Sequence, residues 1–262
     1  MRGWWREISG LVLPAGCAGC GVPRTPLCEA CARELHGPAV RRARPDPEPP
    51  DLPEVYAAAS YADAVRAVLL AHKERGALGL AGPLGRALAG AVRAAAAPST
   101  GRYGRYGRYG PVGARGDAPA TRTDLPLLLV PVPSARRAVR ARGHDAARRI
   151  ARSAAAELRR TGTPARALPV LRQRRGIADQ SGLTARERVE NLAGALEAAP
   201  GSARLLAGGR TVLVDDLMTT GASLAEAARA LGAAAEGRFP AFERMTAAVV
   251  AAPPLFDEIN RN

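Results

Sequence analysis

One stretch, residues 210–224, constrains the fold of this chain more than any other. Its first part, Thr-Val-Leu-Val at 211–214, is a short run of apolar and β-branched residues, which is typical of a buried strand. Two carboxylates, Asp215 and Asp216, follow at the carboxyl end of that strand. A turn of small and hydroxyl residues then leads into an Ala-rich helical run at 224–231. The stretch therefore predicts a strand, a tight loop and a helix N-terminus in direct succession.

The turn after the two carboxylates has the chemistry of an anion site. The free N–H groups of a first helical turn point at a bound anion, and the helix dipole favours negative charge there. Small residues let the backbone close around a phosphate, and hydroxyl groups add donors. The turn consists of Thr219, Thr220, Gly221, Ala222 and Ser223. Asp215 and Asp216 would repel a phosphate but are suited to accept hydrogen bonds from a diol. A phosphate beside a diol describes a ribose 5-phosphate.

Two other interpretations of this stretch compete with a ribose phosphate site. The first is an acidic strand end followed by a Thr N-cap, with no ligand at all. The second is the Walker B strand of a P-loop NTPase, which also needs a G-x-x-x-x-G-K-[ST] loop. The only lysine of the chain, Lys73, lies in Leu-Ala-His-Lys-Glu-Arg, so a P-loop is excluded.

Composition narrows the class of protein and partner. The 262 residues allow one α/β domain of about 200 residues and a small module. A net charge of +14 favours polyanionic partners such as nucleotides or nucleic acid, although a solvated basic surface is the alternative. The near-exclusive use of arginine over lysine is typical of a GC-rich coding bias and says little about function. No apolar run is long enough to span a membrane, so a cytoplasmic protein is expected.

The cysteines predict a metal site. All four lie in two C-x-x-C pairs separated by seven residues, and they are Cys17, Cys20, Cys28 and Cys31. This spacing lets four thiolates converge tetrahedrally, and four cysteines close the coordination shell, so a structural zinc ion is expected. Two disulfides or an iron–sulfur centre are the alternatives, the first being disfavoured in a reducing cytoplasm.

The rest of the chain divides into two parts. Residues 1–50 are expected to hold a short amphipathic helix, the cysteine module and a Pro-rich linker, and residues 51–262 the main domain. Strands are predicted at 55–61, 125–132, 167–171, 211–214 and 245–251, and helices at 62–73, 78–97, 146–160 and 224–231. Residues 98–124 are predicted to be a disordered insertion. Its Gly-Arg-Tyr repeat at 101–110 is either an expanded codon repeat or a stacking surface for single-stranded nucleic acid.

Two arginine-rich stretches are candidates for binding charged groups. Arg136, Arg137, Arg140 and Arg142 crowd the junction between the strand at 125–132 and the next helix. Such a junction lies at the carboxyl edge of a parallel sheet, where a pyrophosphate would fit. Exposed helix arginines are the alternative. The polar loop at 172–191 is expected to be either a mobile basic lid over a charged substrate or a disordered loop.

With these pieces in place, the chain resembles the ComF family of competence-associated, amidophosphoribosyltransferase-like proteins almost from end to end. The residues that carry the resemblance are the double C-x-x-C, residues 61–73, the Val-Pro-Val-Pro run at 130–133, Arg137, Arg142, Gly143, Arg175, Gln180, Leu183, Arg188, Asn191, and the Val-Asp-Asp and Thr-Thr-Gly-Ala-Ser motifs that end at 223. The last motif is highly specific for sites that bind phosphoribosyl pyrophosphate (PRPP).

The resemblance implies a type I phosphoribosyltransferase-like parallel sheet flanked by helices, with a zinc-ribbon-like N-terminal module. It implies that PRPP binds with Mg²⁺, that Asp215 and Asp216 hold the ribose hydroxyls, and that the 219–223 turn holds the 5-phosphate. The segment from Pro133 to Gly143, with Arg137 and Arg142, would face pyrophosphate. A lid carrying Arg175 and Arg188 would complete the catalytic set.

Two functions follow from the resemblance. The first is transfer of a phosphoribosyl group from PRPP to a small-molecule acceptor, with release of pyrophosphate. The alternative is a non-catalytic accessory protein in DNA uptake or processing, which would bind single-stranded DNA or competence proteins. The chain departs from the family at His144-Asp145-Ala146, where Phe-Asn-Gln is usual, and at Ile177, where Thr is usual. These departures concern turnover and leave the ribose phosphate motif intact.

Overall fold

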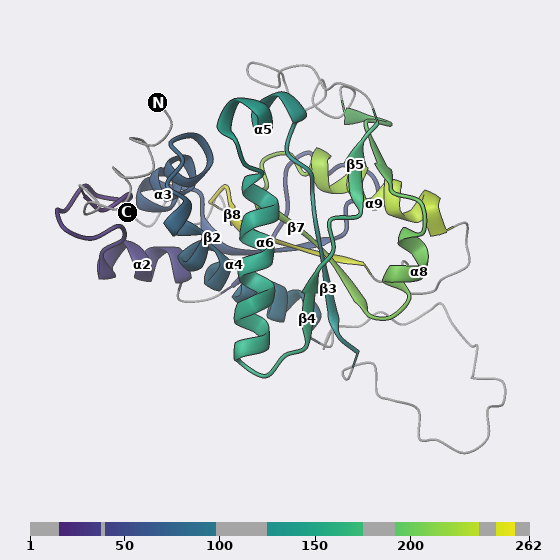
Figure 1. The fold of residues 1–262 in the computed structure, drawn as a ribbon, viewed down its shortest axis with the longest axis horizontal. Coiled ribbons are helices and arrows are strands. Elements are labelled where there is room, and N and C mark those ends of the chain that lie inside the picture. Colours follow the sequence, from purple (N-terminus) through teal and green to yellow (C-terminus); the bar gives the residue numbers. More distant parts are fainter. Residues whose placement is uncertain (1–15, 38–39, 98–124, 175–191, 236–244, 255–262) are drawn as a thin grey trace, which may run out of the picture.

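A six-stranded, mostly parallel sheet forms the centre of the protein (Figure 1). The structure is a computed structural model that describes residues 16–37, 40–97, 125–174, 192–235 and 245–254. The strand order is β1-β2-β8-β7-β3-β4, and every neighbouring pair is parallel except β1 and β2. The strands are β1 (Arg41–Ala43), β2 (Glu54–Ser60), β3 (Leu127–Pro131), β4 (Ala165–Ala167), β7 (Arg210–Leu217) and β8 (Thr246–Ala252).

The interior strands β3 and β8 are apolar along their whole buried length, as is typical of strands covered on both faces. All five residues of β3 are buried, and so are six of the seven residues of β8. Alternate side chains face opposite sides: Leu129 and Val212 pack in one hydrophobic cluster, whereas Leu128 and Leu213 pack in another. These strands were predicted from the same apolar runs, and the prediction is confirmed.

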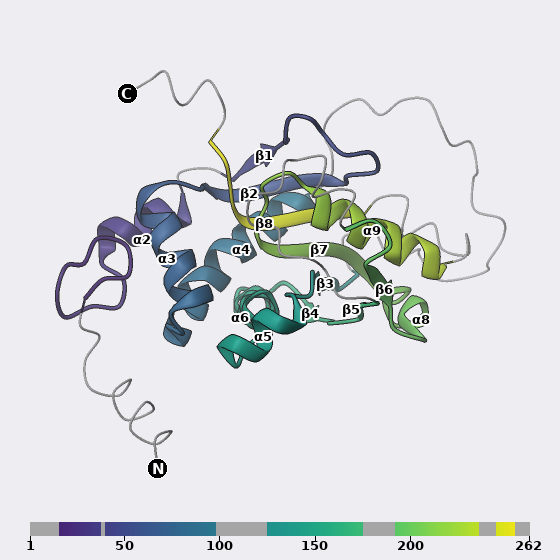
Figure 2. The ribbon, with the colours of Figure 1, turned by 90° about the horizontal axis from the view of Figure 1, so that it is seen from above.

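Helices cover both faces of the sheet. They are α2 (Glu29–His36), α3 (Asp63–Glu74), α4 (Ala81–Ala96), α5 (Arg136–Arg142), α6 (Ala146–Arg160), α8 (Ser202–Leu206) and α9 (Ala222–Ala235), with a 3₁₀ turn η1 at Leu78–Leu80. The apolar side chains of α3, α4 and α6 belong to one core cluster, and those of α9 belong to the cluster on the opposite face (Figures 1 and 2). The four predicted helices correspond to α3, α4, α6 and α9. None of the helices in the described ranges is long and apolar enough to cross a membrane.

The single strand predicted at 167–171 is wrong. β4 ends at Ala167 in the main sheet, and β5 (Leu171–Gln173) pairs instead with β6 (Leu196–Ala198) in a separate two-stranded antiparallel sheet. Pro169 separates them, because it has no N–H to donate to a ladder. The N–H of Val170 donates to the carbonyl of Leu168 at 2.9 Å, which turns the chain around the proline.

The N-terminal module packs directly on the main sheet and its helices. Leu35 of α2 is fully buried in the same cluster as the apolar residues of α3 and α4. The segment predicted to be a Pro-rich linker contributes β1, the antiparallel edge strand, and Arg42 of β1 forms an ion pair with Glu54 of β2 at 2.8 Å. Three predicted segments lie outside the described residues: the short amphipathic helix expected within residues 1–50, at 4–13, the insertion at 98–124, and most of the lid, with Arg175 and Arg188.

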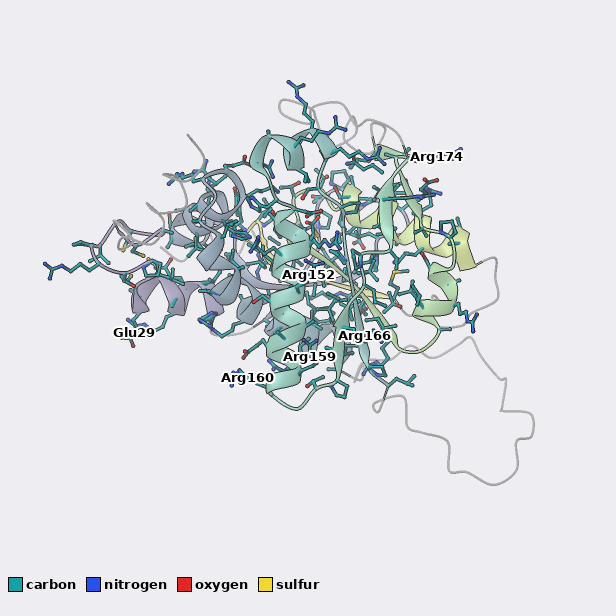
Figure 3. All side chains as sticks on the ribbon, in the orientation of Figure 1. Glu29, Arg152, Arg159, Arg160, Arg166 and Arg174 are labelled. Carbon is teal, nitrogen blue, oxygen red and sulfur yellow. The ribbon has the colours of Figure 1, made fainter. Side chains whose placement is uncertain are left out.

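Arginine side chains project from the outer side of α6. Figure 3 shows Arg152, Arg159 and Arg160 along this helix and Arg166 on the neighbouring strand β4. All four residues are exposed. Part of the positive charge therefore lies on a solvated face away from the strand ends.

Candidate functional site

Asp215 and Asp216 lie near the carboxyl end of β7, and their side chains point to opposite faces of the sheet. The alternation of the strand places Asp216 on the face that α3 and α4 cover, together with Val212 and Val214, and turns Asp215 away from it. Asp216 is only 4% exposed, whereas Asp215 is partly exposed. The carboxylate of Asp215 also accepts the backbone N–H of Asp216 at 2.8 Å, which fixes its orientation.

Lys73 is a site residue, a role that the sequence analysis did not predict. Its ammonium lies 2.8 Å from Oδ2 and 3.1 Å from Oδ1 of Asp216, so the last turn of α3 reaches the acidic end of β7. One signal in the sequence could have found it. Lys73 is the only lysine among 38 lysine and arginine residues, although coding bias favours arginine. A compact ammonium on a flexible stem fits where a planar guanidinium would not.

The charged groups of this cluster shift one another's pKa values. Burial raises the pKa of Asp215 well above its usual value, the negative charge of Asp216 adds to the rise, and Lys73 opposes it. Burial by itself would lower the pKa of Lys73, but the charges of Asp216 and Asp215 outweigh burial, and the pKa is raised. Lys73 is therefore the fixed cation of the cluster, and burial favours the protonated form of Asp215 more than in a solvated carboxyl.

The turn that follows β7 requires glycine at position 221. Gly221 has φ +75°, and a Cβ placed there would lie 3.0 Å from Leu52 and 3.3 Å from Pro45. The turn is therefore packed against the segment that precedes β2. Helix α9 begins at once with Ala222, and the N–H of Ala225 is the first to bond back to the carbonyl of Gly221, at 2.9 Å. The N–H of Ala222 approaches Oγ1 of Thr220 at 3.5 Å, and a helix N-terminus offers its remaining first-turn N–H groups to an anion.

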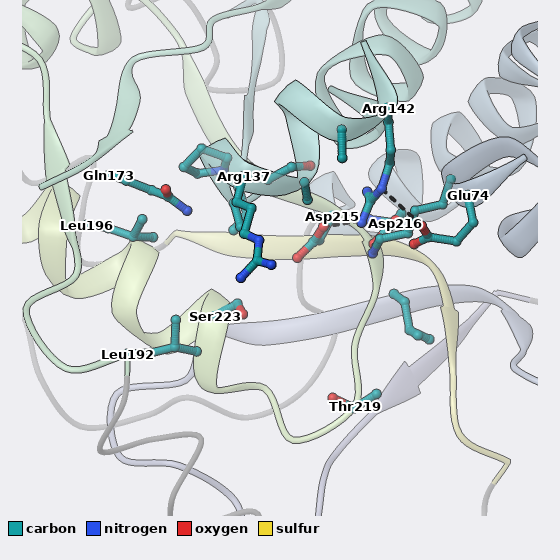
Figure 4. Close-up of a pocket in the computed structure, with 18 residues that line it drawn as sticks. Glu74, Arg137, Arg142, Gln173, Leu192, Leu196, Asp215, Asp216, Thr219 and Ser223 are labelled. Atoms are coloured by element: carbon teal, nitrogen blue, oxygen red, sulfur yellow. Dashed lines mark hydrogen bonds and ion pairs between the residues drawn. The ribbon is translucent and has the colours of Figure 1, made fainter. Parts of the chain in front are cut away.

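A cavity of about 890 Å³ opens between the acidic strand end, the turn and α5 (Figure 4). Seven of the residues predicted to form the site line it: Pro133, Arg137, Arg142, Asp215, Asp216, Thr219 and Ser223. Thr220, Gly221, Ala222 and Gly143 belong to the same turns but do not line it. Lys73, Glu74 and Gln173 line it as well and were not predicted. The cavity thus brings together the acid pair and the hydroxyl turn, which follow one another in the chain, and two arginines from a separate part of it.

The segment expected to face pyrophosphate forms the short helix α5, which ends at Gly143 with φ +77°. Its arginines do not act alike. Arg137 extends into the cavity in Figure 4, whereas Arg142 forms an ion pair with Glu74 at 3.0 Å. Arg136 and Arg140 do not line the cavity, and Arg136 bonds to Gln173 instead. Arg137 is therefore the cavity arginine whose charge no described carboxylate balances.

Asp145, one of the departures from the family pattern, has a local structural role. It is the N-cap of α6, where its carboxylate accepts the backbone N–H of Arg148 at 3.1 Å. The hydroxyl of Ser134 also donates to it at 3.1 Å. Negative charge is favourable at a helix N-terminus, so an aspartate fits here without a ligand.

The four cysteines converge as predicted. The sulfur atoms of Cys17, Cys20, Cys28 and Cys31 all lie within 4.8 Å of one another. Four sulfurs at about 2.3 Å from a tetrahedral zinc ion would lie about 3.8 Å apart, so the cluster fits such an ion with small adjustments. A Cβ on Gly19 would lie 2.6 Å from the sulfur of Cys31, which explains the glycine. The cluster can hold a metal ion such as zinc.

The surroundings of Cys17 favour its thiolate form. Burial by itself raises its pKa, but hydrogen bonds from the backbone N–H groups of Cys28, Cys20 and Gly19 lower the pKa to about 6. The N–H of Cys28 lies 3.2 Å from the Cys17 sulfur. Ala64, in the first turn of α3, packs in the same small cluster as Cys17 and Cys31. The cysteine cluster thus packs against the helix that carries Lys73.

What the site can bind has to be inferred from its geometry. Neither the family models nor the curated proteins that were compared include a match to this chain. The geometry places two carboxylates, a helix N-terminus and Arg137 around one cavity. Such an arrangement can bind a phosphorylated diol together with a second anionic group.

Proposed function

We propose that this protein binds PRPP in the cavity beside β7 and transfers its phosphoribosyl group to a small-molecule acceptor, with release of pyrophosphate. One observation carries the proposal: Asp215 and Asp216 line the same cavity as Thr219 and Ser223. The mostly parallel sheet with helices on both faces suits a type I phosphoribosyltransferase fold of the ComF kind. In parallel α/β sheets, ligands bind at the carboxyl ends of the strands, where these residues lie.

Each part of PRPP has chemically suitable residues. The 5-phosphate would bind at the N-terminus of α9, where Thr219 and Ser223 line the cavity and can add hydroxyl donors to the N–H groups of the first helical turn. The ribose hydroxyls would donate to Asp215 and Asp216. The Lys73 ammonium contacts both carboxylate oxygens of Asp216, at 2.8 and 3.1 Å, so this acceptor is oriented before the substrate arrives.

The pyrophosphate would lie against Arg137, whose guanidinium extends into the cavity. Arg142 contributes less charge, because Glu74 already balances it. Asp215 and Asp216 offer the oxygen ligands that Mg²⁺ accepts, and Asp215 has no cation paired with it among the described residues, so the site fits Mg²⁺ bound with PRPP. Such an ion would neutralise charge on the departing pyrophosphate.

In the transfer, the bond between C1 of the ribose and the pyrophosphate oxygen breaks, and its electron pair leaves with pyrophosphate. The lone pair of the acceptor forms the new bond to C1, and any proton on the attacking atom passes to solvent or to pyrophosphate. The residues of this chain bind and orient the ribose and stabilise the charge of the leaving group. The reaction requires no covalent intermediate with the protein.

The four-cysteine cluster has a structural role in this proposal. Four thiolates would fill the coordination shell of a zinc ion and leave no position for a substrate. Because α2 and the first turn of α3 pack around the cluster, zinc would fix the N-terminal module on the main sheet.

Calorimetric titration with PRPP and Mg²⁺ tests the donor site. Asp215→Asn should weaken binding about 10- to 100-fold, because it removes a charged acceptor of the ribose hydroxyls. Glu34→Gln, an exposed acid on α2, is the control and should bind as the wild type does. Release of pyrophosphate from PRPP with a panel of nucleobases and ammonia then tests transfer. A wild-type protein that does not bind PRPP would overturn the proposal.

A second function is favoured by the exposed arginines of α6 and β4. Arg152, Arg159, Arg160 and Arg166 form a basic face that is suited to a nucleic acid backbone. An accessory protein in DNA uptake or processing would bind single-stranded DNA there. Affinity for oligo(dT) that falls with salt, and a smaller salt slope in Arg152→Ala/Arg166→Ala, would support this function. PRPP-dependent turnover would favour the enzyme.

A further inference from the structure

The two-stranded sheet beside the cavity presents a buried polar residue. In β5 and β6, Gln173 is the register partner of Leu196. The strand alternates, so that Leu171 and Gln173 are buried and Arg172 faces solvent, where it pairs with Glu197 at 2.9 Å. Gln173 is only 5% exposed and lines the cavity. A glutamine at an inward position of an otherwise apolar hairpin needs a chemical explanation, because burial of a primary amide is costly.

The orientation of the Gln173 amide is fixed by its partners. The backbone N–H of Arg136 donates to Oε1 of Gln173 at 3.1 Å, and the Arg136 guanidinium donates to the Gln173 backbone carbonyl at 3.0 Å. A backbone N–H can only donate, so the atom that faces Arg136 must be the oxygen of the amide. The NH₂ group therefore faces the other way, and in Figure 4 it points toward the interior of the cavity.

This NH₂ group is a donor without an acceptor. Among the described residues, Nε2 of Gln173 is buried and has no hydrogen-bond partner. Such a group is unfavourable in the free protein, and a ligand atom that accepts from it gains a bond that water does not already make. The amide thus selects a hydrogen-bond acceptor.

The surroundings of the amide are apolar. Leu192 and Leu196, which are 3% and 2% exposed, line the cavity beside Gln173. Figure 4 shows these three residues on one side of the cavity and Asp215 and Asp216 on the other, with Arg137 between them. The cavity therefore has a charged half that suits PRPP and an apolar half with one directed donor.

Helix α9 holds the apolar half in place. The buried carboxylate of Glu226 accepts the backbone N–H of Leu196 at 2.9 Å, and Arg229 donates to the carbonyl of Leu196 at 3.1 Å. The same helix begins at the proposed phosphate turn. The two halves of the cavity are thus fixed relative to one rigid element.

We propose that Gln173, Leu192 and Leu196 form the subsite for the acceptor substrate, and that this substrate is a planar heterocycle with a carbonyl oxygen. The leucines pack against the ring, and the Gln173 NH₂ group donates to the oxygen. The inference rests on the proposed function, since it assigns the second substrate of the same cavity. Gln173 is a specificity residue in this proposal and takes no part in breaking the bond to pyrophosphate.

The test compares ligands that differ in donor and acceptor at one position. Hypoxanthine and uracil carry an exocyclic carbonyl oxygen at the position where adenine and cytosine carry an amino group. Each is titrated into protein with and without saturating ribose 5-phosphate, pyrophosphate and Mg²⁺, which fill the charged half without allowing transfer. The wild type should bind at least one oxo compound about tenfold more tightly than its amino counterpart.

The decisive variant is Gln173→Glu, which keeps the oxygen that faces Arg136 and replaces the NH₂ group by an acceptor. It should reverse the preference, and the ratio within each pair cancels any effect of its charge on phosphate binding. Arg172→Gln, on the outward face of the same strand, should keep the wild-type ratio. Thermal melting checks that each variant is folded.

The outcomes separate the two proposals. Equal binding of both members of each pair by the wild type, or an unchanged ratio in folded Gln173→Glu, would overturn the acceptor subsite. If Gln173→Glu does not fold, the wild-type ratio alone decides. A wild type that binds PRPP but shows no preference between oxo and amino compounds would contradict only the acceptor subsite. A wild type that does not bind PRPP sinks the proposed function, and with it the assignment of this pocket to an acceptor.

Discussion

The ammonium of Lys73 lies 2.8 Å from Oδ2 of Asp216 and joins the last turn of α3 to the acidic end of β7. Asp216 is only 4% exposed, and Lys73 is its one cationic partner among the described residues. The pair therefore has two consequences. It stabilises a buried carboxylate, and it sets the charge of the site before any substrate binds.

Removal of the Lys73 ammonium should destabilise the protein. Lys73→Met keeps the length of the side chain but leaves Asp216 buried without a partner, which should cost about 2 kcal/mol. The value lies below that for a fully buried pair, because the Lys73 side chain is 34% exposed. Urea denaturation measures the change, and Arg75→Met, at an exposed position beside α3, is the control.

A double-mutant cycle separates the ion pair from other effects of the substitution. Asp216→Asn should lose less stability in the Lys73→Met background than in the wild type, because the carboxylate that needs a partner is gone. Strictly additive effects of the two substitutions would show that the pair contributes nothing to stability.

Zinc should be present in the purified protein at about one ion per chain. Cys31→Ser should remove it and lower the melting temperature, because Cys31 and Ala64 pack in the cluster that joins the module to α3. Metal analysis and melting curves with and without a chelator measure both effects. A folded protein with no metal and four titratable thiols would contradict the assignment.

Local sequence patterns were sufficient for the parts of the fold that depend on neighbouring residues. The apolar runs predicted β3, β7 and β8, the helical periodicities predicted α3, α4, α6 and α9, and the cysteine spacing predicted the convergence of four thiols. The residues from Asp215 to Ser223 needed no long-range information, because a strand, turn and helix that follow one another must lie together.

The missed features all depend on contacts between distant parts of the chain. Lys73 meets Asp216 across 143 positions, and no periodicity encodes that approach. The position of Gln173 depends on the separate hairpin of β5 and β6, which begins after Pro169. This hairpin places the Gln173 amide at the cavity. The edge strand β1 was not predicted, because prolines surround it and because it has only three residues, which pair with β2. The roles of Arg175 and Arg188 stay predictions.

Gly221 should tolerate no side chain. Gly221→Ala places a Cβ at φ +75° and 3.0 Å from Leu52, so it should destabilise the protein by about 1–2 kcal/mol and weaken PRPP binding. Gly232→Ala is the matched control in α9, where a Cβ meets nothing within 4 Å. That substitution should stabilise the helix by up to about 1 kcal/mol. Equal effects of both substitutions on stability would argue against a strained turn at Gly221.

The contribution of Glu226 to stability should depend on pH. Burial by itself raises the pKa of Glu226, but hydrogen bonds from Arg229 and from the Leu196 N–H outweigh it and hold the pKa below its usual 4.5. An acid with a lowered pKa in the folded state contributes stability above its unfolded pKa and loses it as pH falls through the folded value. Glu226→Gln, which keeps the shape but not the charge, should cost about 2 kcal/mol at pH 7.

Urea denaturation of wild type and Glu226→Gln between pH 7 and pH 3 measures this dependence. The difference in unfolding free energy should be constant down to about pH 4.5 and then shrink, because protonated Glu226 resembles glutamine. Glu34→Gln, at an exposed position, should show little difference at any pH. A difference that persists unchanged at pH 3 would contradict a contribution that is lost when Glu226 takes a proton.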